Sequence, residues 1–65
     1  MTEAEMRTLV ETAGAQWLGL SCGLVMFNDP QTGSSCALYE RALRDADDIK
    51  AALLRKREQF AEAKS

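Results

Sequence analysis

The sequence contains no histidine and only two cysteines, Cys22 and Cys36, among its 65 residues. Histidine is the commonest general base and the commonest metal ligand in proteins, so its absence excludes Ser-His and Cys-His dyads. Two cysteines do not by themselves complete a structural zinc site, which requires four ligands. The sequence therefore predicts a protein that is not an enzyme and that holds no cofactor or metal ion.

Long apolar runs and a secretory leader are also missing. The longest mainly apolar stretch, residues 13–27, is interrupted by glycines and polar residues and is too short to span a membrane. Glu3, Glu5 and Glu11 occupy the region in which a signal peptide would be positively charged. We therefore expect a cytoplasmic protein without a membrane partner. Its two cysteines are expected to be buried, reduced thiols, and a disulfide or redox switch between them is the alternative.

Positive charge is scarce as well. The net charge is −2, which is not the strongly basic balance expected of a general nucleic-acid binder. The acidic residues dominate the first 40 positions, and the basic residues dominate the rest of the chain. Arg55, Lys56 and Arg57 are a candidate basic contact, but Glu58 follows them directly. Nucleic acid is therefore not the expected partner.

Two further polar clusters lack the pattern of a ligand site. Asp45, Asp47 and Asp48 are not followed by the glycine and the closing glutamate of a calcium loop. Residues 29–34 lack the paired glycines and the Lys-Ser/Thr pair of a phosphate loop. We interpret the first cluster as the start of a helix and the second as a turn.

Residues 24–39 have the pattern of a β-hairpin. An apolar run, Leu24 to Phe27, leads into the turn residues, and a second run of β-compatible residues ends at Tyr39. Pro30 presets the first corner of the turn, Asp29 can accept a backbone hydrogen bond two residues on, and Gly33 can adopt the positive φ that closes the loop. A two-stranded hairpin is marginal alone in water, so the flanking segments must cover it.

The segment before the hairpin has a helical pattern. Thr2 and Glu5 have the spacing of a capping box. Apolar residues then recur at spacings of three and four: Met6, Val10, Ala13, Trp17, Leu20 and Leu24. The preferred prediction is a helix over about 3–21 that ends at Gly23 in a left-handed conformation. Because Gly14 and Gly19 weaken a helix, the alternative is an end near Ala13 with an extended lead-in over 17–22.

The segment after the hairpin predicts a second helix over about 45–62. Asp45 is a plausible N-cap, and the acidic residues that follow it suit the positive end of the helix dipole. The expected inward stripe is Ala46, Ile49, Leu53, Lys56 and Phe60, with Ala52 and Leu54 beside it. The sequence thus predicts one small α+β domain over 1–65 with the order αββα, in which two helices pack on one face of a two-stranded antiparallel hairpin.

Such a fold leaves one side of the hairpin uncovered. The side chains of a strand alternate between two faces, so two helices on one face cannot bury every apolar residue of the ribbon. The candidate partner face is Leu24, Met26, Phe27 and Tyr39. These residues would form a contact surface or an open edge for strand addition, with isolated exposed apolar residues as the alternative. A 65-residue core is small, which also favours association with another protein or a second copy.

The pattern resembles the small αββα head-to-tail joining proteins of tailed phages, of the lambda W type. The matching pieces are a Thr-capped helix over 2–20, the turn at Gly23, the hairpin over 24–39, and the helix start Asp45-Ala46-Asp47-Asp48-Ile49-Lys50. The resemblance implies an αββα fold and a role as a small protein of virion assembly.

The leading functional hypothesis is a non-catalytic protein-binding or assembly module. The first alternative is a small inhibitor or regulator, encoded by a phage or mobile element, that binds a host protein complex. The second alternative is a DNA-binding accessory protein acting through Arg55, Lys56 and Arg57. The hypotheses predict different behaviour. A connector self-associates, whereas the affinity of a DNA binder depends steeply on salt concentration.

Overall fold

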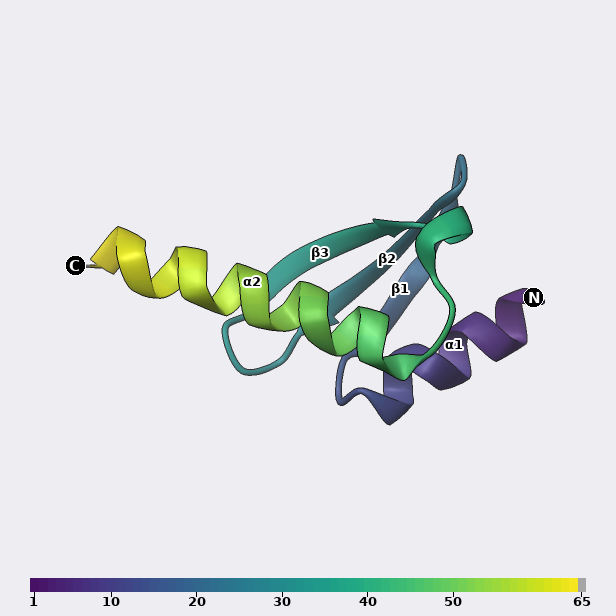
Figure 1. Ribbon diagram of the computed structural model, residues 1–65, viewed down its shortest axis with the longest axis horizontal. Coiled ribbons are helices and arrows are strands. Elements are labelled where there is room, and N and C mark those ends of the chain that lie inside the picture. Colours follow the sequence, from purple (N-terminus) through teal and green to yellow (C-terminus); the bar gives the residue numbers. More distant parts are fainter. Residues whose placement is uncertain (65) are drawn as a thin grey trace.

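The computed structural model describes residues 1–64, which form a three-stranded antiparallel sheet and two helices (Figure 1). The elements are α1 (Glu3–Thr12), β1 (Gln16–Ser21), β2 (Leu24–Asp29), β3 (Ser34–Tyr39), the short 3-10 helix η1 (Glu40–Ala42) and α2 (Ala46–Lys64). The strands lie in the order β1-β2-β3. The expected αββα fold is therefore wrong: the order is α-β-β-β-α, and the additional strand comes from the segment assigned to the first helix.

The first helix ends at Thr12 because Gly14 stops it. Gly14 has a φ of 87°, its N–H donates to the Glu11 carbonyl, and the Ala15 N–H donates to the Val10 carbonyl. This pair of bonds is the Schellman motif, which satisfies the last carbonyls of a helix. The preferred helix over 3–21 is thus wrong, and the alternative end near Ala13 is the one observed. At the other end, the capping box of Thr2 and Glu5 is confirmed by both of its hydrogen bonds.

A two-residue turn joins β1 to β2. Cys22 and Gly23 both have positive φ, 50° and 75°. Two positive φ values in a two-residue loop are the geometry of a type I′ turn, whose twist matches that of the strands it joins. Gly23, expected to end a helix, is therefore the second corner of a hairpin turn.

The hairpin of β2 and β3 pairs from Leu24 with Tyr39 to Asp29 with Ser34 without a shift in register. Its turn has the chemistry expected from the sequence. Asp29 accepts a hydrogen bond from the Gln31 N–H at 3.0 Å, and Gly33 has a φ of 74°.

The second helix begins with a network of aspartates. Asp45 lies directly before α2 and accepts from the Asp47 N–H at 3.0 Å. Asp48 reaches back and accepts from the N–H groups of Arg44 and Asp45, and these two bonds lower the pKa of its carboxyl. The helix start is therefore satisfied by side chains, as helix starts require.

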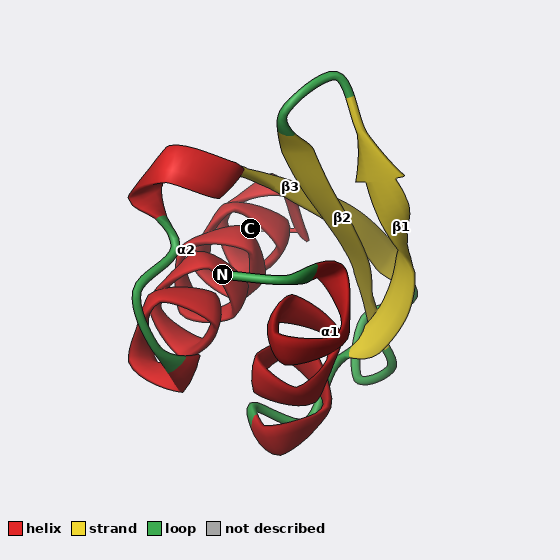
Figure 2. Ribbon diagram, turned by 90° about the vertical axis from the view of Figure 1, so that its right-hand side faces the viewer, coloured by secondary structure: helices red, strands yellow, loops and turns green. Residues whose placement is uncertain are grey.

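Both helices lie on the same side of the sheet (Figure 2). α1 packs against β1, α2 packs against β3, and the two helices contact each other. The buried hydrophobic residues are Met6, Val10, Ala15, Val25, Phe27, Leu43, Ile49 and Leu53. Phe60, expected in the inward stripe of α2, is 39% exposed and lines a surface hollow with Ser34 and Ser35 instead of lying in the core. The C-terminal part of α2 extends beyond the sheet (Figure 1).

Candidate protein-binding surface

The face of the sheet opposite the helices carries an apolar patch, which we call the open face: Leu24, Met26, Ala37 and Tyr39. Leu18, the unpaired residue of the β1 bulge, is a further exposed apolar residue of the sheet. The register places Leu24 opposite Tyr39 and Met26 opposite Ala37 on neighbouring strands. Directly opposed residues of an antiparallel pair point to the same side of the sheet. Tyr39 is 58% exposed, so this patch is accessible to a partner.

Three of the four predicted contact residues lie together on the open face, and one does not. Leu24 and Met26 are half-buried beside Tyr39, whereas Phe27 is fully buried under the helices. Phe27 is one position after Met26, and consecutive strand residues point to opposite faces. Including it in the candidate face was therefore wrong. Leu18 was missed because its segment was assigned to a helix.

The open face is uncharged over the described strands. Its remaining strand positions are Gln16, Gly19, Ser21, Asn28 and Ser35. A charge appears only at the margin, where the Arg41 guanidinium lies 5.1 Å from the centre of the Tyr39 ring. Because charged side chains resist desolvation, an uncharged face is less costly to bury against a partner.

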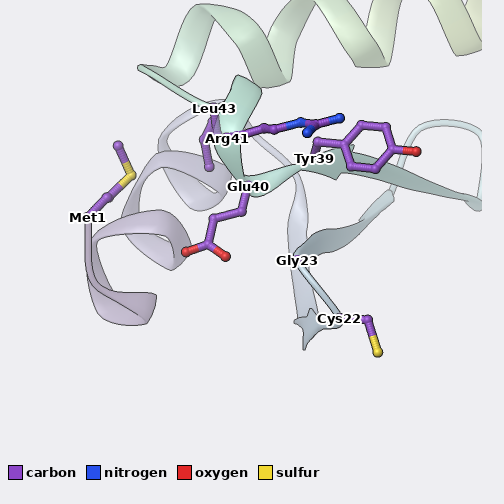
Figure 3. Close-up of a pocket in the computed structure, with 7 residues that line it drawn as sticks. All are labelled: Met1, Cys22, Gly23, Tyr39, Glu40, Arg41 and Leu43. Carbon is purple, nitrogen blue, oxygen red and sulfur yellow. The ribbon is translucent and has the colours of Figure 1, made fainter.

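A hollow of about 660 Å³ adjoins the margin at Tyr39 (Figure 3). It is lined by Met1, Cys22, Gly23, Tyr39, Glu40, Arg41 and Leu43. In Figure 3 the Arg41 side chain runs beside Tyr39, the Glu40 carboxylate points away from them, and the Cys22 thiol is directed elsewhere. Catalysis requires groups that converge on one reacting atom, and these do not converge.

The candidate basic contact is divided by the fold. Arg57 donates to Asp29 from two nitrogens, Nε to Oδ2 at 2.8 Å and a terminal nitrogen to Oδ1 at 3.0 Å. The Asp29 side chain is fully buried, and the bonds from Arg57 hold the pKa of its carboxyl below the usual value. Arg57 therefore joins α2 to the end of β2, and only Arg55 and Lys56 remain as candidates for a contact.

Sequence reasoning identified Asp29 as a turn residue but missed its ion pair. The two partners are separated by 28 positions, and no local pattern links them. A carboxylate two positions after Phe27, in alternation with Val25 and Phe27 on one face of the strand, is the available signal, because a buried charge needs a partner.

The cysteines occupy different environments, and both are free thiols. Cys22 is exposed in the turn between β1 and β2, so the expectation that both are buried is wrong. Cys36 is half-buried on the covered face, and this burial raises the pKa of its thiol.

Within residues 1–64, no three histidine, cysteine or acidic side chains are grouped so that they could hold a metal ion. None of the helices in this part of the chain combines the length and the apolar character needed to cross a membrane.

Comparison with known proteins gave no match to a protein family, to a curated protein or to a solved structure, so the function is inferred from the geometry of this chain.

Proposed function

We propose that this chain is a non-catalytic assembly module whose open face packs against the open face of a second copy. The observation that carries the proposal is the position of Leu24, Met26, Ala37 and Tyr39 on a sheet face that neither helix covers. Contiguous exposed apolar residues on a small protein are typical of an interaction site.

A second copy is the occupant that the charges favour. A two-fold contact places the same surface of both copies together, so any charge on it meets a like charge. The strand residues of the open face carry no charge, and two such faces can approach without repulsion. Two sheet faces pack at about 10 Å with interdigitating side chains, which suits a patch of separate apolar side chains.

The size of the face limits the strength of the contact. Three six-residue strands make a face about 20 Å long and about 10 to 15 Å wide. Its flat area is about 200 to 300 Å², whereas a stable interface buries about 800 Å² on each partner, so this face is smaller than a stable interface requires. We therefore expect association that depends on concentration rather than an obligate dimer.

A two-fold contact between faces closes at two copies. A ring of the kind suggested by the phage joining proteins would need a second contact surface, so the proposal is independent of that resemblance. We also propose the cytoplasm as the location, because an exposed unpaired thiol such as that of Cys22 persists in a reducing compartment.

The test is the mass of the protein in solution, measured by light scattering from micromolar to millimolar concentration. We expect the wild-type mass to rise toward that of a dimer and the double variant Met26→Ser, Tyr39→Ser to stay monomeric and folded. Leu54→Ser is the matched control, since Leu54 is 56% exposed but lies on α2. A monomeric wild-type chain at millimolar concentration contradicts self-association and favours a different protein as the occupant.

A further inference from the structure

The two edges of the sheet differ. The β1 edge is irregular, because the register shifts between Trp17 and Gly19. A bulge of this kind protects an edge against pairing with another strand. The β3 edge is regular over its full six residues and carries no bulge. Of the two edges, β3 is therefore the better template for an additional strand.

The hydrogen bonds of β3 fix which backbone groups face outward. The Glu40 N–H donates to the Gly23 carbonyl at 2.8 Å, which continues the β2–β3 ladder. Both backbone groups of a strand residue point to the same side, and successive residues alternate. The N–H and C=O groups of Ser35, Ala37 and Tyr39 therefore point away from β2, in the spacing that a fourth strand requires.

α2 packs beside β3 (Figure 1). A groove lies between these two elements. It consists of two adjoining hollows of about 350 and 280 Å³, which share Lys56 and Gln59. On the strand side both hollows are lined by consecutive residues, 34 to 37. One hollow is lined by Ser34 and Ser35 and the other by Cys36 and Ala37. Because consecutive side chains point to opposite faces, each hollow lies beside the strand rather than over one face.

The charge of the groove is positive although the chain is acidic. The α2 side of the groove carries Arg55 and Lys56, and the lining includes no carboxylate. In the described part of the chain the ion pairs involve Arg7 and Arg57 only. Arg55 and Lys56 therefore remain available to carboxylates of a partner.

We propose that an extended acidic segment of another protein binds in this groove and pairs with β3 as a fourth strand. Backbone bonds to Ser35, Ala37 and Tyr39 supply affinity, and carboxylates at alternate positions of the segment face Arg55 and Lys56. A second copy is less suitable, because pairing two β3 edges brings the two basic groups together. This site shares Ala37 and Tyr39 with the open face but uses their backbone groups rather than their side chains, and it does not depend on self-association.

The first test uses a synthetic peptide of alternating threonine and glutamate, with a threonine-lysine peptide of the same length as control. We expect amide hydrogen exchange, followed by NMR on the folded protein, to slow at Ser35, Ala37 and Tyr39 when the acidic peptide is added. The amides of Cys36 and Leu38, which already face β2, should change little. Equal protection by the lysine peptide, or no change at these amides at millimolar peptide, overturns the proposal.

The second test uses variants of the two sides of the groove. Ala37→Pro removes an outward N–H without removing a ladder bond, and it should abolish peptide binding. Arg55→Glu should weaken binding roughly tenfold or more through like-charge repulsion. Lys50→Glu, also on α2 but not among the groove residues, is the matched control and should bind like the wild type. If Ala37→Pro fails to fold, Arg55→Glu decides, and unchanged affinity of that variant contradicts the proposal.

Two other occupants are distinguishable in the same experiments. Protection of Ser35, Ala37 and Tyr39 that rises with protein concentration in the absence of peptide assigns the edge to a second copy. If a single-stranded oligonucleotide displaces the acidic peptide at a concentration lower than that of the peptide, the groove is assigned to nucleic acid. Either result overturns the assignment to an acidic protein segment.

Discussion

The two faces of the sheet contain similar side chains but differ in how far these side chains are buried. The covered face presents Trp17, Leu20, Val25, Phe27, Cys36 and Leu38 to the helices. The open face presents Leu24, Met26, Ala37 and Tyr39 to solvent. Apolar content alone does not distinguish them. The covered face also includes Asp29, whose buried carboxylate forms an ion pair with Arg57 of α2. This specific contact joins the covered face to the helix.

Burial on one face accounts for the hydrophobic core, while the other face stays exposed and is the face that we propose for binding. Phe27 and Tyr39 make the contrast sharp, since both are large aromatic residues of adjacent strands and their exposures are 0% and 58%. If the open face were part of the folding core, its residues would affect stability as strongly as those beneath the helices.

The largest expected effect separates these two aromatic residues. Phe27→Ala should lower the free energy of unfolding by about 3 to 5 kcal/mol, which is comparable to the whole stability of so small a domain. Tyr39→Ala should cost less than about 1 kcal/mol, mainly the cation–π contact with Arg41. Urea unfolding followed by circular dichroism measures both. Equal losses for the two variants would mean that the faces do not differ as described.

The next effect concerns the contact that fixes the covered face to α2. Asp29→Asn should lower the free energy of unfolding by about 2 kcal/mol, since hydrogen bonds to charged groups are worth about 1.5 to 3 kcal/mol each and Asn keeps part of the network. Glu11→Gln is the control, because its partner Arg7 is 3.8 Å away and both side chains are more than half exposed. Comparable losses of unfolding free energy in the two variants would show that the buried ion pair stabilises the fold no more than the exposed pair does.

The pH dependence of stability should come largely from the same carboxyl. The pKa of Asp29 is lowered in the folded state, so its ionised form stabilises the fold above the unfolded value of about 3.9. This contribution should be lost as the pH falls from about 4 through the lowered pKa. Asp29→Asn should flatten this part of the profile, while Glu5 and Asp48 leave a smaller residual slope. An unchanged acid profile in the variant would rule out Asp29 as its source.

A smaller loss of stability is expected for substitutions of Gly14, which lies between the end of α1 and the start of β1. Gly14→Ala should cost about 1 to 2 kcal/mol, because an L side chain is strained at the φ of 87°. Gly14→Asn should cost less, since Asn tolerates the left-handed region. Thermal unfolding of both variants tests the order. If Ala is tolerated as well as glycine, the Schellman motif does not limit α1.

Local chemistry was sufficient to predict some of these elements and not others. The hairpin turn at Asp29 to Gly33 and the capping box of Thr2 depend on near neighbours, and the sequence shows them directly. The strand β1 was assigned to a helix because Trp17 and Leu20 are three positions apart, a helical spacing. The bulge between Trp17 and Gly19 shifts the alternation by one residue, so both side chains reach the covered face from a strand.

The open face was predicted only in part for the same physical reason. Alternation separates Met26 from Phe27 once a strand is assumed, but it does not reveal which side the helices cover. That choice depends on contacts far apart in the chain, such as Asp29 with Arg57. The groove beside β3 also depends on the packing of α2 and has no signal in the local sequence.

The most direct test of the central claim is NMR of the wild-type protein diluted from millimolar to micromolar concentration. We expect the methyl signals of Leu24 and Met26 and the ring signals of Tyr39 to shift with concentration. The signals of Val25 and Phe27, on the covered face of the same strand as Met26, should stay constant. Concentration-independent signals throughout the open face would contradict its assignment as the self-contact surface.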